Sequence, residues 1–325
     1  MELQVVSKPP IILPESVIDS TDIPFIQANT VVVRQQELAD THLIPVYVKD
    51  NEPVISHQDF ISCTQEIVHQ LYRSEQVLQP SIRVSHPIKG RTPEAKDKPA
   101  KDLLEHEKTI YYERMAFVIE IPSIKDTING NELSLTIGGV KSYSLDNLYN
   151  RKGSDEHFKV FIGFQNKVCC NLCVWTDGYT GNLKVKNTAQ LMKGIYDMIV
   201  AYKADKQLFA LQNLLHYSLT EHEFATLIGR AKLYQYLPLI EKKQIQPLSF
   251  GETQIGMIAR DYYQDASFCR RDDGSISLWN VYNLFTGANK QSYIDTFLDR
   301  GVNAFEFVEN LAQSIESKAN SWFLN

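Results

Sequence analysis

The chain of 325 residues is 43% hydrophobic and 22% charged, a globular composition large enough for one large or two ordinary domains. Its formal net charge of −6 excludes a uniformly basic surface that wraps nucleic acid, and it is far too small for an acidic DNA mimic. Five irregularly spaced cysteines favour a reducing compartment. No secretory signal opens the chain and no apolar run approaches the ~20 residues of a membrane span. We therefore expect a cytoplasmic protein without membrane contact.

The first half of the chain is predicted to be rich in β-strands. Four prolines make residues 1 to about 30 an irregular segment. Strands are expected at 43–49, 82–84 and 111–121. A helix capped by Ser56 is expected to continue to about Tyr72, because its apolar residues recur at helical spacing. Residues 86–107 are charged and contain prolines, which predicts a loop.

The strongest strand signals lie in the middle of the chain. A strand is expected over 133–138, where two glycines end it. The stretches 158–164 and 168–175 alternate large apolar residues with small or polar ones, which predicts a β-hairpin with its turn at 165–167. Gly163 in mid-strand indicates a bulge or the close approach of another backbone.

The second half of the chain is predicted to be helical. The expected helix starts are at Asn187 or Thr188, at Thr220 with Glu223, at Ser249 with Glu252, at Ser277, and at Asn303 with Glu306. The protein is therefore predicted to be α+β, with a β-rich N-terminal half, a central β-hairpin and a helical C-terminal half. In that division, residues 31–180 form the β-rich region with one helix. Residues 181–325 pack on it as mainly helical structure, so that the whole forms one compact unit.

Few residues form a recognisable catalytic or metal-binding pattern, and none of these patterns identifies a reaction. Cys170 and Cys173 form a C-x-x-C pattern, but on a strand their side chains point to opposite faces, so we expect structural thiols and no metal. Asp155 and His157 place a carboxylate beside an imidazole, which could support acid–base catalysis if Asp177 converges on them. A solvated entry to the hairpin is the alternative. No glycine-rich phosphate motif is present, so no cofactor is expected.

The segment 81–101 is basic although the whole chain is acidic. It carries six Lys or Arg residues against two carboxylates, and two tyrosines and an arginine follow it. Cations beside exposed aromatic rings are typical of single-stranded nucleic-acid binding, whereas a solvated loop is the alternative. The candidate nucleic-acid-binding residues are Arg83, Lys89, Arg91, Lys96, Lys98, Tyr111, Tyr112 and Arg114.

Four stretches of the chain carry a resemblance, namely SIRVSHPIKGR, YYERMAFVIEIP, NLYNRKGSDEHFKVFIGFQNKVCCNLCVWTDGY and LFTGANKQSYIDTFLDRGVNAFEFVENLAQSIESKANSWFL. They resemble an uncharacterised family, a domain of unknown function carried on phages, plasmids and integrative elements of gut anaerobes. The run from Val168 to Asn171 is also distantly similar to phage/plasmid-like proteins of unknown function, with Leu172 in place of their glycine. The resemblance implies a mobile-element accessory protein and supplies no activity.

Three functions therefore remain open. A non-enzymatic module that binds single-stranded nucleic acid is favoured by the basic segment. A factor that binds a host protein is the second, and an enzyme with a site around Asp155, His157 and Asp177 is the third. The sequence does not determine the ligand or the oligomeric state.

Overall fold

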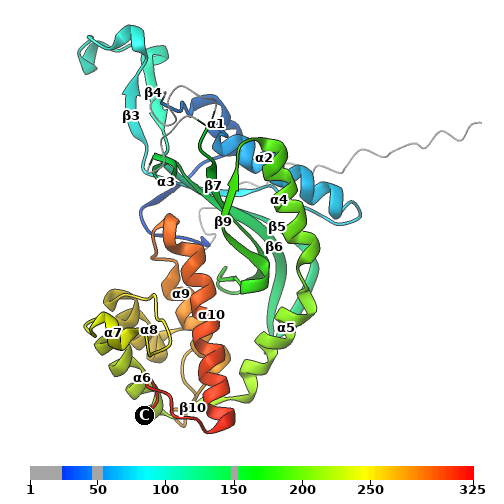
Figure 1. The fold of residues 1–325 in the computed structure, drawn as a ribbon, viewed down its shortest axis with the longest axis vertical. Helices are drawn as coiled ribbons and strands as arrows, with labels where there is room; N and C mark the ends of the chain where they lie inside the picture. Colours follow the sequence, from blue (N-terminus) through cyan, green and yellow to red (C-terminus); the bar gives the residue numbers. More distant parts are fainter. Residues whose placement is uncertain (1–23, 46–53, 148–152) are drawn as a thin grey trace, which may run out of the picture.

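The α+β fold class is confirmed by a computed structural model, which describes residues 24–45, 54–147 and 153–325. A curled antiparallel sheet built from the N-terminal half lies beside the helices of the C-terminal half (Figure 1). The sheet strands are β1 (Thr30–Val32), β2 (Ser81–Ser85), β5 (Arg114–Ile128), β6 (Asn131–Ser142), β7 (Glu156–Asn166), β8 (Leu172–Cys173) and β9 (Tyr179–Val185). Their order is β1-β2-β5-β6-β7-β8, and β9 also pairs with β7.

The helices are distributed over both halves. They are α1 (Gln35–Thr41), α2 (His57–Leu71), α3 (Tyr143–Asn147), α4 (Thr188–Ala201), α5 (Ala204–Asn213), α6 (Glu221–Tyr234), α7 (Leu239–Lys242), α8 (Glu252–Gln264), α9 (Leu278–Asn289) and α10 (Ile294–Ser317). Two small ribbons pair β3 (Ile88–Arg91) with β4 (Lys108–Tyr111) and β10 (Ser218–Leu219) with β11 (Ile276–Ser277). In the described ranges, no helix has the length and apolar character that crossing a membrane requires.

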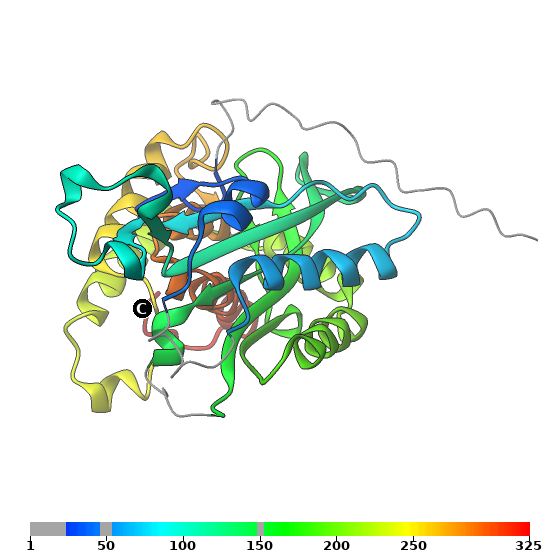
Figure 2. The same cartoon turned by 90° about the horizontal axis from the view of Figure 1, so that it is seen from above.

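The central strands are covered on both faces because their residues alternate between two apolar clusters. Phe117 and Phe158 point to the face where α2 and α4 pack, which are neighbours in the view from above (Figure 2). Ala116 and Phe161 point to the opposite face, against the first turns of α10. The larger cluster continues from the sheet into α6, α8, α9 and α10, so one hydrophobic core connects the two halves.

Several predicted elements are confirmed. The helix capped by Ser56 is α2, in which Ser56 accepts a hydrogen bond from the Asp59 amide at 3.0 Å and the Asp59 carboxylate accepts one from the Ser56 amide. The predicted caps Asn187, Thr220 and Ser277 begin α4, α6 and α9. These starts were predictable because a capping side chain satisfies backbone donors locally.

The central hairpin differs from the prediction. Strand β7 is longer than expected, and its partner β8 has only two residues. The turn spans 167–171 instead of 165–167. The side-chain amides of Asn166 and Asn171 donate hydrogen bonds to Asn283 of α9. Cys170 has a φ of 55°, which is not a strand conformation. This segment therefore does not continue the backbone pairing with β7. Gly163 does allow a close approach, because a Cβ there would collide with the Cys173 carbonyl oxygen.

Other boundaries are also corrected. The two glycines at 138 and 139 lie inside β6 instead of ending it. Glycine is needed at both positions, because a Cβ would collide with the Phe117 carbonyl oxygen at Gly138 and with the Phe60 ring of α2 and the Lys159 carbonyl oxygen at Gly139. The last helix begins at Ile294, well before Asn303, and α8 is capped by Gly251, not Ser249. Residues 43–45 are not in a strand, and the rest of that predicted strand lies outside the described residues, as do residues 1–23.

All five cysteines are free thiols. Cys173 is fully buried as predicted, whereas Cys170 is only partly buried because it lies in the turn before β8. Burial raises the pKa of the Cys173 thiol to about 12, so it stays protonated. Among the described residues, no group of three or more His, Cys, Asp or Glu side chains is placed to hold a metal ion.

Candidate functional site

A buried lysine lies at the end of β6, where that strand leads into α3. The side chain of Lys141 is 0% exposed, and its Nζ donates to Asp146 Oδ2 at 2.7 Å and to Glu156 Oε2 at 3.0 Å. Its ammonium also lies 4.0 Å from the centre of the Phe158 ring. A buried ammonium needs this compensation, because desolvating an unpaired charge costs several kcal/mol.

The two carboxylates are themselves held by neighbouring groups. Glu156 accepts hydrogen bonds from the Ile55 backbone amide just before α2, at 3.1 and 3.2 Å. Asp146 lies on α3, which turns the chain back toward β7, and its Oδ1 accepts from the His157 amide at 2.9 Å. The group of Lys141, Asp146, Glu156 and His157, called the charge cluster below, therefore joins α3 to the ends of β6 and β7.

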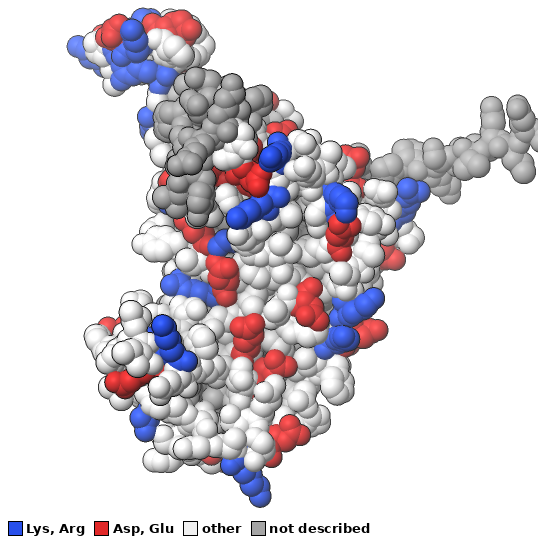
Figure 3. Space-filling model, in the orientation of Figure 1, with Lys and Arg blue, Asp and Glu red and all other residues white. Residues whose placement is uncertain are grey.

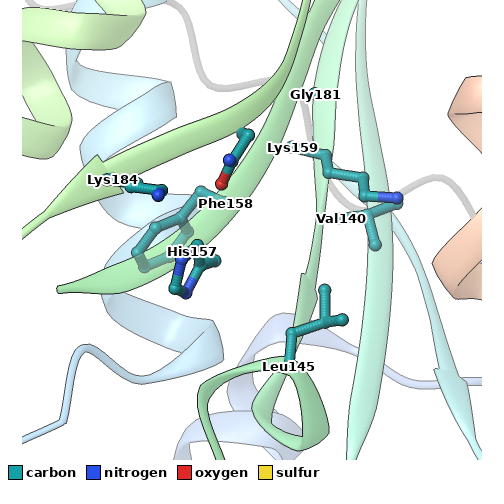
Figure 4. A pocket seen from close by; sticks show the side chains of 8 residues that line it. Val140, Leu145, His157, Phe158, Lys159, Gly181 and Lys184 are labelled. Carbon is teal, nitrogen blue, oxygen red and sulfur yellow. The ribbon is translucent and has the colours of Figure 1, made fainter. Parts of the chain in front are cut away.

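His157 faces the opposite side of the sheet from Glu156, because adjacent residues of a strand alternate. Its Nδ1 lies 3.2 Å from Asp146 Oδ1. Its ring lines a hollow of about 320 Å³, shown in Figure 4. The lining residues are Val140, Leu145, His157, Phe158, Lys159, Gly181, Asn182 and Lys184.

A second polar group lies beside the charge cluster and was not predicted from the sequence. The Tyr143 hydroxyl accepts from the His57 amide at 3.0 Å, and the rings of His42 and His57 stack with centroids 4.9 Å apart. His57 Nε2 donates to the Tyr112 carbonyl at 2.9 Å, and the Tyr112 amide donates to His42 Nδ1 at 3.1 Å. Burial lowers the pKa of His57 well below its ordinary value and that of His42 to about 4, so both imidazoles are neutral near pH 7.

Asp177 is not brought together with the other two predicted catalytic residues. Asp155 is half-buried just before β7, and His157 lies in the hollow. Asp177 is exposed in the short 3-10 helix Thr176–Gly178, which packs against Ile162. At ~3.3 Å per residue, that point is roughly 16 Å along β7 from His157. The carboxylate that contacts His157 is Asp146, which sequence spacing alone did not single out.

The predicted basic loop is a β-hairpin that projects from the body (Figure 1). This arm, residues 88–111, consists of β3, β4 and three short 3-10 helices, Pro93–Ala95, Ala100–Asp102 and Glu105–Glu107. Lys89 and Arg91 share one face of the ribbon because they are two residues apart. Lys108 lies directly opposite Arg91 in the pairing, so it shares that face. Figure 3 shows Lys and Arg side chains gathered on the arm, together with several carboxylates.

Several charged side chains of the arm are paired within the arm itself. Lys98 pairs with Glu107, and Arg91 donates to the Lys98 carbonyl. Lys108 pairs with Glu105 at 2.6 Å on the surface. Within the described ranges, Lys89 and Lys96 make no ion pair. The face that carries Lys89, Arg91 and Lys108 is called the cation row below.

The remaining candidate nucleic-acid residues lie elsewhere. Arg83 is in β2, where its guanidinium donates to the Thr30 hydroxyl and carbonyl. Arg114 begins β5 and pairs with Glu113 and Asp295. Tyr111 and Tyr112 are only 7% and 4% exposed, so neither ring offers a surface on which a base can stack. The expectation of stacking platforms at these two positions is therefore not supported.

Comparisons with known proteins assign a family and no activity. A family model described as "Domain of unknown function, B. Theta Gene description (DUF3871)" matches residues 7–324. The chain therefore belongs to this family over nearly its whole length. No curated protein and no solved structure matches it.

Proposed function

We propose that this member of the DUF3871 family is a non-enzymatic nucleic-acid-binding protein whose arm contacts phosphates. The observation that carries the proposal is the cation row, in which strand pairing aligns Lys89, Arg91 and Lys108 on one face of a projecting ribbon. An accessory role on a mobile element is part of the proposal and rests on the sequence resemblance alone.

The arrangement favours contact with the phosphate backbone over contact with bases. Residues two apart on a strand are separated by ~6.6 Å, and cross-strand neighbours by ~5 Å, so the cations of the row can contact adjacent phosphates. No Phe, Tyr or Trp occurs between Ile88 and Ile110, so that stretch offers no ring for stacking. Binding is therefore expected to be insensitive to sequence. A single strand is the expected ligand, and a duplex is the alternative because a two-stranded ribbon also fits a major groove.

The test is a fluorescence-anisotropy titration of labelled single-stranded and duplex oligonucleotides at several salt concentrations. Each phosphate neutralised on a single strand contributes a salt slope of about −0.7, so three contacts give a slope of roughly −2. Replacing the cation row with glutamines (K89Q, R91Q, K108Q) should abolish most of that slope. A matched control removes three exposed lysines of the C-terminal half (K206Q, K232Q, K243Q) and should leave binding unchanged. An equal loss of oligonucleotide binding in the cation-row variant and in the control variant would contradict the proposal.

A second candidate function is docking to a protein, which one observation favours. Four large apolar side chains near the end of α6 and in α7 are strongly exposed, at 58%, 74%, 78% and 75% for Leu233, Tyr236, Leu239 and Ile240. Exposed apolar clusters of this kind mark interaction surfaces. A pulldown from the native host with and without nuclease separates the two functions. A stoichiometric protein that survives nuclease, and is lost from a variant with L239S and I240S, would favour docking.

A further inference from the structure

We infer that the hollow between β6, β7 and β9 is a phosphate-binding subsite in which His157 and Lys184 are the ligands. The inference adds a site that the arm does not contain. It rests on the proposed function only for the source of the phosphate, which is either a nucleic-acid strand or a free nucleotide.

The first argument is the charge of the hollow. Its lining holds an imidazole, two lysines and an asparagine, and none of the described residues that line it carries a carboxylate. This composition is unusual in a chain with a formal net charge of −6. Such a hollow, bordered by the apolar side chains of Val140 and Leu145, concentrates anions because low-dielectric walls strengthen the local field.

The second argument is the placement of the two ligands. His157 and Lys184 are direct partners in the pairing of β7 with β9, which sets their Cβ atoms ~5 Å apart on one face. Both side chains border the same space in Figure 4. With its Nδ1 hydrogen donated to Asp146, the His157 ring donates to a phosphate through Nε2 when both ring nitrogens carry a proton. The protonated ring and the Lys184 ammonium can then contact different oxygens of one phosphate, and hydrogen bonds between charged groups and phosphate are the stronger kind.

The third argument is that the other charges nearby are already engaged. Asp146 accepts from Lys141 through Oδ2 and from the backbone and ring of His157 through Oδ1, so both of its carboxylate oxygens are already hydrogen-bonded. Lys159 Nζ donates to the Asp295 carbonyl and to Asp299. Lys184 forms no ion pair with any residue in the described ranges, which leaves its ammonium available for a ligand.

The subsite lies at the same end of the molecule as the base of the arm. Leu145 of α3 lines the hollow, and Tyr143 of the same helix stacks on Tyr111 at the end of β4, with ring centroids 5.7 Å apart. Helix α3 therefore links the hollow to the base of the arm, and a phosphate of a strand bound by the arm, or of its end, is the occupant that we infer.

The experiment uses inorganic phosphate as the probe and NMR of ring-labelled histidines as the readout. We expect the His157 resonances of the full chain to shift with millimolar phosphate and not with equal ionic strength of chloride. K184Q should weaken phosphate binding about tenfold or more, the usual effect of losing one charge-assisted hydrogen bond. Because Lys184 is exposed, this variant is expected to fold, and H157Q serves as the second variant after its thermal unfolding has been checked. K206Q is the matched control.

Oligonucleotides with a 5′-phosphate or a 5′-hydroxyl, and a mononucleotide, then identify the source. Tighter binding of the 5′-phosphorylated strand than of the 5′-hydroxyl strand, lost in K184Q, supports a strand end as the occupant. Binding of the mononucleotide alone supports a free nucleotide and would count against the proposed function, not against the subsite. Absence of a His157 shift with phosphate, or a shift unchanged in K184Q, overturns the subsite. The cation-row variant separates the two proposals, because it should lose strand binding and retain phosphate binding.

Discussion

The buried lysine of the charge cluster provides the sharpest test of the fold. Replacing Lys141 by methionine keeps the length of the side chain and removes the ammonium that pairs with both Asp146 and Glu156. The two carboxylates are 5% and 1% exposed, so water cannot replace the ammonium. Breaking a buried ion pair from one side costs about 3–5 kcal/mol, and here one substitution removes the ammonium from two buried carboxylates. We expect K141M to lower the free energy of unfolding by at least that range.

The matched control neutralises the whole set. In the triple variant K141M, D146N, E156Q the amide oxygens still accept from the His157 and Ile55 backbone amides, whose present acceptors are those carboxylates. Since no charge is then buried, we expect its stability to return to within ~1–2 kcal/mol of the parent. Equilibrium unfolding in urea measures both variants. A loss below ~1 kcal/mol for K141M, or a triple variant as unstable as the single one, would refute this reasoning.

Other predictions concern pH, the sheet and an exposed helix. Burial lowers the pKa of His42 from 6.5 to about 4, so the unfolded chain takes up a proton between these values that the folded chain does not. Stability should therefore fall as the pH drops through that window, by about 2 kcal/mol at pH 5 from this residue. Comparing urea unfolding at pH 7 and pH 5 for the parent and for H42Q should show that difference. G138A should lower stability by about 1–3 kcal/mol, because its Cβ would collide with the Phe117 carbonyl oxygen in the adjacent strand. G229A, on an exposed face of α6 with nothing within 4 Å, should raise stability by ~0.5–1 kcal/mol, and thermal unfolding checks the opposite signs.

The elements that sequence reasoning located are those whose signals are local. The helix α2 has its capping residue and its apolar stripe in one continuous stretch, and α9 begins at the serine that predicted it. By contrast, α10 begins after Tyr293, whose side chain makes no capping hydrogen bond. Its true start therefore carries no capping signal, whereas Asn303 and Glu306 form a capping pattern inside the helix and wrongly predict a start there.

The candidate site was harder to predict because its contacts are made by tertiary structure. Lys141 follows a run of apolar and glycine residues, and nothing near it in sequence indicates that Glu156 would compensate its charge. Tyr111 and Tyr112 have the composition of stacking platforms, yet their rings pack against His42 near the base of the arm. Whether an aromatic ring beside cations is exposed depends on what folds over it, and α1 and α3 come from distant parts of the chain.

The arm offers a way in which an acidic protein can approach a polyanion. Charges more than a Debye length apart, ~8 Å at physiological ionic strength, are largely screened from each other. Strands of four residues extend ~13 Å, so much of the ribbon lies beyond the repulsion of the body. Yet the arm also carries five carboxylates between Glu94 and Glu107, close in number to its cations. The proposed binding would therefore depend on how the ribbon separates the charges, with Lys89 and Arg91 on one face, and not on the net charge of the arm. A contact with so few phosphates is weak at physiological salt. The proposed phosphate-binding subsite in the hollow would add affinity, because one strand would then be bound at two weak sites at once.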